Sequence, residues 1–492
     1  MKNIKNPLLI NTFYLISTTF IIRILGFLNR IMVTRILQLE GMTLYVLITP
    51  TIFLFLTIST ISINMSMTKL VSESVATTKY SPLKLLKAGH KLLFKFSIIT
   101  IILFLISYKF ISINLLKDHN LIYPLLCSIP LYIVTGHTDL YKGYFNGIKE
   151  IKTSCVAVII EQIARIFSTI ILVYSFYKCG IVVSVCLCVL SDTVGEIISL
   201  LYLKIKIKNH LISFENTQNE EQVLFKMALP STLNHLLSKI TLFLEPIIYT
   251  NLLINILPTE QIKNFYTIFT AYTLSLITMS LFIPQSLCSS SMPELTEIFV
   301  KKKYKQTTAY INKIIAYSLY LGLFITIIVN NYGGFLMKVF YQSEYGVDLI
   351  NPIVWFFILC YIELPFANAI NAFGKTKENF IICSIVYCLK LVFIFVFYKK
   401  GLYTIIYAEC LTLIIHTIIN YLFLSKLINY KLNLSNIFYI GLVFITCFLF
   451  DIIINTFINI QVINILLLTV VYLLLGSLLK NVIEGKYKSS SI

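Results

Sequence analysis

Long apolar runs separated by short charged clusters constrain this chain more than any other feature. A membrane-spanning helix needs about 20 consecutive and mostly apolar residues. The 492-residue sequence offers about fourteen such runs, and its longest hydrophilic stretch covers only residues 204–226. An apolar share of 58% and a charged share of 13% also differ strongly from those of soluble domains. The sequence therefore predicts an all-α polytopic membrane protein without a soluble domain.

The expected spans follow from these apolar runs. They lie near residues 11–28, 44–61, 92–111, 121–140, 154–177, 181–202, 229–253, 265–287, 314–330, 350–372, 380–398, 402–424, 437–454 and 462–479. Lys2 and Lys5 precede the first run without a cleavage motif after it, so we expect a retained first span and not a signal peptide. Residues 83–96 interleave four lysines with Leu and Phe, which predicts a basic amphipathic helix at the inner membrane surface. This helix either meets the substrate headgroup or serves only as a lipid-anchored connector.

The distribution of basic residues predicts the orientation. Cytoplasmic loops of membrane proteins are enriched in Lys and Arg. Most of the forty Lys and Arg residues fall in the segments that would be inside if the N-terminus is inside, including residues 69–95, 142–152 and 301–313. An even number of spans then places both termini in the cytoplasm at the cell membrane. The formal net charge of +18 is explained by anionic inner-leaflet lipid, so no nucleic-acid partner is needed.

Three pairs of similar segments indicate an internal repeat. Residues 23–37 resemble residues 239–253, MTKL at 67–70 resembles MPEL at 292–295, and GIKE at 147–150 resembles GKTKE at 374–378. The pairs keep one order along the chain, and six spans separate their members. Two six-helix bundles related by an axis along the membrane normal are therefore expected. The predicted domains are residues 1–208, residues 209–430, and residues 431–492 with two extra helices and a cytoplasmic tail.

Several motifs together resemble a known family. They are GFLNR at 26–30, TRIL at 34–37, EG at 40–41, KGYFNGIKE at 142–150, IIEQIARI at 159–166 and ALPSTLNHLL at 228–237. In this order they are similar to the stage V sporulation protein B family, within the multidrug/oligosaccharidyl-lipid/polysaccharide flippase superfamily. One departure is Gln38, where glycine is usual in such loops.

The resemblance implies a secondary transporter that flips a lipid-linked saccharide to the outer leaflet by alternating access. The cargo would be a peptidoglycan precursor such as lipid II or a polysaccharide repeat unit, in the service of spore cortex synthesis. The implied partners are this substrate, membrane lipids and cell-wall synthesis proteins. No cofactor is implied, although a coupled Na⁺ or H⁺ would contribute to the driving force.

A cavity that carries a pyrophosphate needs cations inside the membrane. Arg23 lies in the middle of the first expected span, where a lipid-facing charge costs roughly 3 kcal/mol or more, and Lys239 is its repeat mate. Arg binds phosphate through two donors at once. With Asn29, Arg30 and Glu245, these residues form the candidate substrate cavity. The alternative is that Arg23 and Lys239 neutralise structural carboxylates and that Arg30 is an interfacial residue.

Other embedded charges are candidates for ion pairs or coupling sites. Glu161 and Arg165 are four residues apart on one helix face, as are Asp192 and Glu196. The first two predict an ion pair. The second two would repel unless a proton, a cation or a basic residue joins them. Further candidates in the second half are Glu363, Lys390 and Glu409, with Lys390 and Glu409 expected to pack together.

Each alternative function requires a different feature of the sequence or a different response to mutation. A multidrug antiporter of the same superfamily would need an acidic cavity. A membrane glycosyltransferase or ligase would need catalytic acids or bases, and the longest expected outer loop, residues 331–349, contains no such constellation. A scaffold would be insensitive to neutralising Arg23. No HExxH and no GxxxxGKS motif is present, and the eleven Cys are scattered, so neither a metal site nor ATP hydrolysis is expected.

Overall fold

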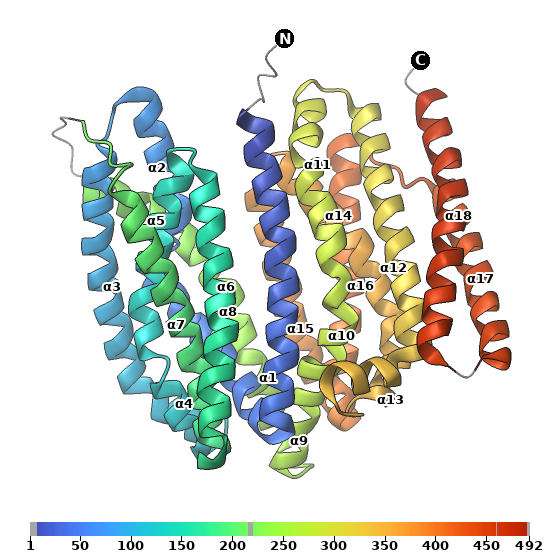
Figure 1. Ribbon diagram of the computed structural model, residues 1–492, viewed down its shortest axis with the longest axis horizontal. Helices are drawn as coiled ribbons and strands as arrows, with labels where there is room; N and C mark the ends of the chain where they lie inside the picture. The colour runs from blue at the N-terminus through green and yellow to red at the C-terminus, as the bar shows by residue number, and fades with distance from the viewer. Residues whose placement is uncertain (1–6, 215–219, 459, 490–492) are drawn as a thin grey trace. The chain divides into compact units, whose positions relative to one another are not determined.

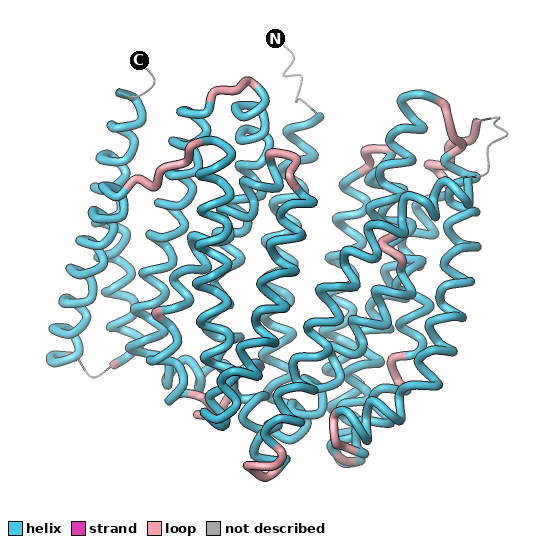
Figure 2. The backbone as a smooth tube through the Cα atoms, turned by 180° about the vertical axis from the view of Figure 1, so that it is seen from behind, coloured by secondary structure: helices cyan, strands magenta, loops and turns pink. Residues whose placement is uncertain are grey.

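A computed structural model describes residues 7–214, 220–458 and 460–489, and all regular elements in these ranges are helices (Figure 1 and Figure 2). Within these ranges ten helices are long and apolar enough to cross a membrane, or eleven if the bent pair Val347–Val354 and Phe356–Ala372 forms one span. The all-α polytopic class is thus confirmed. The count of fourteen stays a prediction, because Ser17–Thr77 and Thr376–Ile428 are each much longer than one crossing requires. Lys2 and Lys5 lie outside the described residues.

The chain forms two compact units. Unit 1 consists of Met1–Thr267 with Ile394–Thr404, and unit 2 consists of Ile268–Phe393 with Ile405–Ile492. Unit 1 contains α1 (Pro7–Thr60), α2 (Ile63–Thr77), α3 (Pro82–Phe110), α4 (Ile122–Leu126), α5 (Ile129–Gly147), α6 (Ile151–Phe176), α7 (Ile181–Ile207), α8 (Glu220–Leu253) and α9 (Thr259–Thr267). Unit 2 contains α10 (Leu274–Thr278), α11 (Phe282–Val300), α12 (Tyr304–Tyr341), α13 (Val347–Val354), α14 (Cys360–Ala372), most of α15 (Thr376–Phe397), α16 (Thr404–Ile428), α17 (Leu434–Phe457) and α18 (Gln461–Ser489). The predicted repeat and its boundaries stay predictions.

The first two expected spans differ from the prediction in how they are joined. We expected helices near 11–28 and 44–61 with a loop between them, whereas α1 runs through both. The connecting residues hold neither glycine nor proline before Gly41, and helical structure continues through them on both sides of a single break. The only non-helical residue inside α1 is Gln38, with φ 53° and ψ −163°, a region of backbone space that normally requires glycine. The expected loop is therefore a kinked helix.

Helix α3 also begins earlier than expected. Pro82 occupies its first turn, where a missing N–H is tolerated, and the basic segment 83–96 continues without a break into the apolar span. The four lysines of this segment are exposed, as are apolar residues further along the same helix. The predicted amphipathic helix is therefore present, and it is the first part of a long helix that continues into the span.

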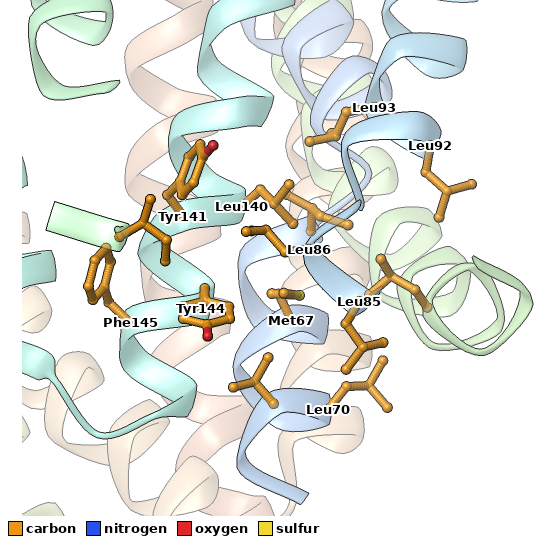
Figure 3. Packing of buried hydrophobic residues seen from close by; sticks show 14 of the residues in the cluster. Met67, Leu70, Leu85, Leu86, Leu92, Leu93, Leu140, Tyr141, Tyr144 and Phe145 are labelled. Atoms are coloured by element: carbon orange, nitrogen blue, oxygen red, sulfur yellow. The ribbon is translucent and has the colours of Figure 1, made fainter. Parts of the chain in front are cut away.

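The core of unit 1 is built where α2, α3 and α5 meet. Figure 3 shows Met67 of α2, Leu86 of α3 and Tyr144 of α5 among the buried side chains of this cluster. Two glycines of α5 set the distance to α2. A Cβ atom at Gly143 would lie 2.6 Å from the backbone oxygen of Asn64, and one at Gly147 would lie 2.6 Å from the Cβ of Val71. This is the close approach that a GxxxG spacing permits between membrane helices.

A late segment of the chain completes unit 1. The helical turn Tyr398–Tyr403 packs against α8 and α9. The Tyr249 hydroxyl donates a hydrogen bond to the backbone oxygen of Leu402 at 2.7 Å, and the rings of Phe265 and Tyr403 meet edge to face with centroids 5.5 Å apart.

In unit 2, a buried cluster of residues from α11, α12, α14, α16 and α17 forms the main core. Helices α17 and α18 lie side by side as a hairpin (Figure 1). The hairpin contacts α12 through a second buried cluster that includes Ile327, Cys447 and Tyr472. The appended helices of the prediction are therefore anchored on α12.

Candidate functional site

Five ionisable residues from α5, α6 and α7 form what we call the unit 1 charge cluster: Lys142, Glu161, Arg165, Asp192 and Glu196. Glu161 is its centre. One carboxylate oxygen, Oε2, lies 2.7 Å from Lys142 Nζ, and the other, Oε1, accepts a hydrogen bond from Arg165 Nη2 at 2.9 Å. Arg165 Nε lies 3.2 Å from Asp192 Oδ1, within ion-pair distance. The predicted pair of Glu161 with Arg165 is present, and Arg165 also satisfies Asp192.

Lys142 is the member of this cluster that sequence reasoning missed. We assigned it to a cytoplasmic loop, and this is wrong. Helix α5 continues to Gly147, which places Lys142 inside the helix with only 7% of its surface exposed. The motif KGYFNGIKE was a usable signal, because its glycine spacing is typical of a packed membrane helix and not of a loop.

Helices α6 and α7 approach closely at the cluster. A Cβ atom at Gly195 would lie 2.9 Å from the backbone oxygen of Glu161. The next residue, Glu196, is 6% exposed, and its Oε2 atom has no hydrogen-bond partner among the described residues. Asp139 of α5 interacts electrostatically with Lys142, Glu161 and Glu196. The acids of this region, Asp139 included, therefore outnumber Lys142 and Arg165.

The candidate cavity residues of α1 are more exposed than the charge cluster. Arg23 is exposed and is flanked by exposed apolar residues such as Ile24. Arg30 and Asn29 are half-buried, and Asn29 Oδ1 is buried without a hydrogen-bond partner in the described part of the chain. Arg30 acts electrostatically on the hydroxyl of Tyr45, as Arg165 does. Arg30 and two members of the charge cluster, Arg165 and Asp192, therefore act on the same hydroxyl.

The candidates on α8 have different environments. Lys239 is half-buried, and its Nζ lies 5.3 Å from the centre of the Phe53 ring, a cation–π geometry. Glu245 is 6% exposed and accepts a hydrogen bond from the Tyr266 hydroxyl at 3.3 Å. Lys239 thus remains accessible to a ligand, whereas Glu245 is held inside unit 1.

Unit 2 pairs its candidates separately. Glu363 Oε1 lies 3.2 Å from Asn420 Nδ2 and 3.4 Å from His416 Nε2. Lys390 Nζ lies 2.5 Å from Glu409 Oε2, so the expected packing of these two residues is present. Sequence reasoning missed the contribution of His416, because it lies on α16 and Glu363 lies on α14.

A histidine pair in unit 1 was also missed. His90 Nδ1 of α3 and His137 Nδ1 of α5 are 3.0 Å apart, and His90 Nε2 lies 3.2 Å from the Tyr141 hydroxyl. The sequence shows no common spacing for these histidines, since their proximity results from the packing of two helices. Among the described residues no group of three His, Cys, Asp or Glu could hold a metal ion.

Two solved structures of membrane transporters share the fold of this chain. The structure of the lipid II flippase MurJ in an inward closed conformation has a TM-score of 0.68 at 17% sequence identity, covering 94% of this chain and 98% of that one. An inward-facing multidrug resistance MATE family transporter of the MOP superfamily has a TM-score of 0.63 at 12% identity, covering 82% and 94% of the two chains. The fold is thus shared by flippases and drug transporters.

Sequence comparison places the chain within a family. Residues 8–299 match the polysaccharide biosynthesis protein family, and the chain belongs to that family. It is 28% identical to stage V sporulation protein B of Bacillus subtilis over 396 residues, which cover 78% of this chain and 76% of the relative. It is 24% identical to the lipid II flippase MurJ of the same organism over 414 residues, covering 78% and 75%. The family match and the similarity to stage V sporulation protein B confirm the resemblance predicted from the motifs.

Proposed function

We propose that this protein moves lipid-linked saccharides from the cytoplasmic to the outer leaflet by alternating access. The cargo is a peptidoglycan precursor such as lipid II, or a polysaccharide repeat unit. The observation that carries this proposal is the likeness to a lipid II flippase over 94% of the chain, joined to membership in a polysaccharide biosynthesis family. Similarity to a stage V sporulation protein supports a role in making spore cortex peptidoglycan.

Both termini are proposed to be cytoplasmic. The excess of Lys and Arg in the segments predicted to be inside supports this orientation. A membrane potential that is negative inside then favours outward movement of an anionic headgroup, at about 2.3 kcal/mol per charge and 100 mV. The potential alone can therefore contribute to export. Cell-wall synthesis enzymes that use the exported saccharide are the proposed protein partners.

Arg23 is proposed to bind the pyrophosphate during transport, with Arg30, Asn29 and Lys239 as supporting contacts. We expect Arg23→Ala to lower the transport rate at least tenfold, because a bidentate phosphate contact is lost. Lys239→Ala should lower it less. The measurement is the outward appearance of a labelled undecaprenyl-pyrophosphate saccharide in proteoliposomes.

The matched control for these variants is Lys178→Ala, which removes an exposed charge outside the proposed cavity. It should transport at the native rate. Native transport by a correctly folded Arg23→Ala protein would exclude the proposed phosphate contact. If the native protein itself moves no saccharide but exports cationic drugs, the MATE-like fold indicates a multidrug antiporter instead.

The unit 1 charge cluster is proposed to couple transport to Na⁺ or H⁺. Its excess of acids and the unpartnered Oε2 of Glu196 support this role. We expect Glu196→Gln to abolish the acceleration of transport by an ion gradient, while transport driven by the membrane potential persists. The rate is compared with and without a Na⁺ or pH gradient at a fixed potential. The control is Glu73→Gln, which changes a surface pair with Lys79 and should keep the acceleration of transport by the ion gradient. If Glu196→Gln also keeps this acceleration, the coupling role is refuted.

A further inference from the structure

The exposed face of α3 changes its chemistry along the helix, and none of the sites described above uses it. Four exposed lysines follow each other at intervals of three or four residues, so they line up on one side of the helix. We call them the α3 basic stripe: Lys84, Lys87, Lys91 and Lys95. The same side continues with Ile98, Ile102 and Ile106, which are 42%, 52% and 74% exposed. A basic stripe thus passes directly into an apolar one.

The opposite face of α3 is packed inside unit 1. The side chains of Leu85, Leu93 and Phe104 are fully buried there. A Cβ atom at Gly89 would lie 2.4 Å from Cδ1 of Leu140, so α3 and α5 are in close contact. The helix cannot rotate to bury its lysines without losing this packing. The α3 basic stripe therefore has to face the surroundings of unit 1.

The length of α3 places the stripe at the level of the lipid headgroups. Helical structure continues from Pro82 to Leu115, and these 34 residues extend about 51 Å. The hydrocarbon core of a bilayer is only about 30 Å thick. The part from Phe96 to Leu115 is long enough to fill this core, at about 30 Å. The lysines before it then lie in the headgroup layer, while the apolar stripe meets the acyl chains.

Glu221 at the start of α8 shows how the stripe holds an anion. Its Oε2 lies 2.9 Å from Lys91 Nζ and its Oε1 lies 2.5 Å from Lys95 Nζ, so two lysines converge on one carboxylate. The side chains of these lysines nevertheless stay 65% and 52% exposed. A phosphodiester offers two charged oxygens as a carboxylate does, and lysine binds both groups through charge-assisted hydrogen bonds. The same two lysines can therefore hold a phosphate.

We propose that the α3 basic stripe binds the phosphate of an anionic phospholipid, whose acyl chains lie along the apolar stripe of the same helix face. Such a lipid matches both parts of the face, because its headgroup is negative and its chains are apolar. Glu221 competes with the phosphate for Lys91 and Lys95. The assignment to the inner leaflet rests on the orientation proposed above, whereas the binding itself does not depend on any transported substrate.

A saccharide headgroup fits this face less well than a phospholipid. Between Lys95 and Lys109 every exposed residue of α3 is apolar. These side chains offer no hydrogen bond to a sugar that moves across the membrane, although they suit acyl chains that stay in one leaflet. The face is therefore assigned to a resident lipid and not to the path of the cargo.

The test is native mass spectrometry of the full-length protein in detergent, titrated with phosphatidylglycerol or with phosphatidylcholine. We expect native protein to bind phosphatidylglycerol at least about tenfold more tightly, because each lysine near an anionic group adds to the attraction. Added salt should reduce this preference. One variant replaces the whole stripe by glutamine: Lys84→Gln, Lys87→Gln, Lys91→Gln and Lys95→Gln. It should lose the preference, whereas arginine at the same four positions should keep it.

The matched control removes the same charge from exposed lysines where α11 ends and α12 begins: Lys301→Gln, Lys302→Gln, Lys303→Gln and Lys305→Gln. It should keep the preference for phosphatidylglycerol. An equal loss in both fourfold variants would mean that only the overall charge attracts lipid, and the proposal would be overturned. It would also be overturned if an undecaprenyl-pyrophosphate saccharide displaced phosphatidylglycerol from native protein, because the face would then belong to the cargo.

A single substitution tests the same surface if the fourfold glutamine variant folds poorly. Glu221→Gln removes the competing carboxylate and should tighten the binding of phosphatidylglycerol. Glu297→Gln, which releases Lys301 from a surface pair, should leave it unchanged. Equal binding by these two variants would refute the proposal. Since lipid binding is measured without transport, its failure would leave the proposed flippase function standing, and the reverse also holds.

Discussion

Replacing Glu161 with alanine is expected to lower the free energy of unfolding by about 3–5 kcal/mol, the range for removing one partner of a buried ion pair. Glu161 forms ion pairs with both Lys142 and Arg165, and it is only 5% exposed. Its loss leaves Lys142 buried without its nearest counter-charge. The measurement is denaturant-induced or thermal unfolding of the purified protein in detergent.

Two comparisons make this prediction specific. Glu73→Ala removes the half-buried partner of the exposed Lys79 and should change stability by less than about 1 kcal/mol. The double variant Glu161→Ala, Lys142→Met should recover part of the lost stability, because the stranded ammonium group is gone. Equal effects of Glu161→Ala and Glu73→Ala would mean that the cluster is hydrated and does not act as a buried ion pair.

Gly143→Leu is expected to prevent the folded state of unit 1 from forming. The added Cβ would lie 2.6 Å from the backbone oxygen of Asn64 and 3.1 Å from its Cα, and backbone atoms cannot move aside as a flexible side chain can. The neighbouring Gly147 adds a second close contact, so α2 cannot simply shift along α5. We expect a yield of monodisperse protein below a tenth of native in size-exclusion chromatography.

Gly441→Leu is the control for this substitution, since a Cβ at Gly441 would have no neighbouring atom within 4 Å. It should be purified in native amounts. A monodisperse Gly143→Leu protein with native melting behaviour would show that α2 and α5 are not held in close contact.

Hydropathy predicted the helices well because a membrane span can be recognised from its apolar composition alone. The expected spans 154–177 and 181–202, for example, correspond to α6 and α7. The departures concern how elements are joined. The amphipathic helix predicted at residues 83–96 runs without a break into the next span, and α1 continues past Gln38 with one strained residue in place of an irregular loop. The sequence shows Gln38 at a position where glycine is usual, but it does not show how short the connection between the first two spans is.

Pairs within one helix could be predicted from their spacing, whereas most pairs between helices could not; Lys390 of α15 and Glu409 of α16 are the exception. Glu161 and Arg165 were found because a four-residue spacing puts two side chains on one face. Glu161 and Lys142, on different helices, give no such signal. The same holds for Asp451 of α17 and Asn331 of α12, which are hydrogen-bonded although they lie 120 residues apart. Asn331 was moreover expected in an outer loop, yet it lies inside α12, which ends at Tyr341. Only the packing of helices shows which embedded charges have partners.

The segment Ile394–Thr404 has a consequence for how the chain is synthesised. It belongs to unit 1, where Leu402 and Tyr403 contact α8 and α9, although all of Ile268–Phe393 is translated before it. Domains normally fold in the order in which they leave the ribosome. In this protein, unit 1 cannot complete its packing, and part of α8 and α9 stays uncovered in the membrane, until most of unit 2 has been inserted. The two halves therefore mature together, and a truncated chain that ends at Thr267 would lack a part of its own first unit.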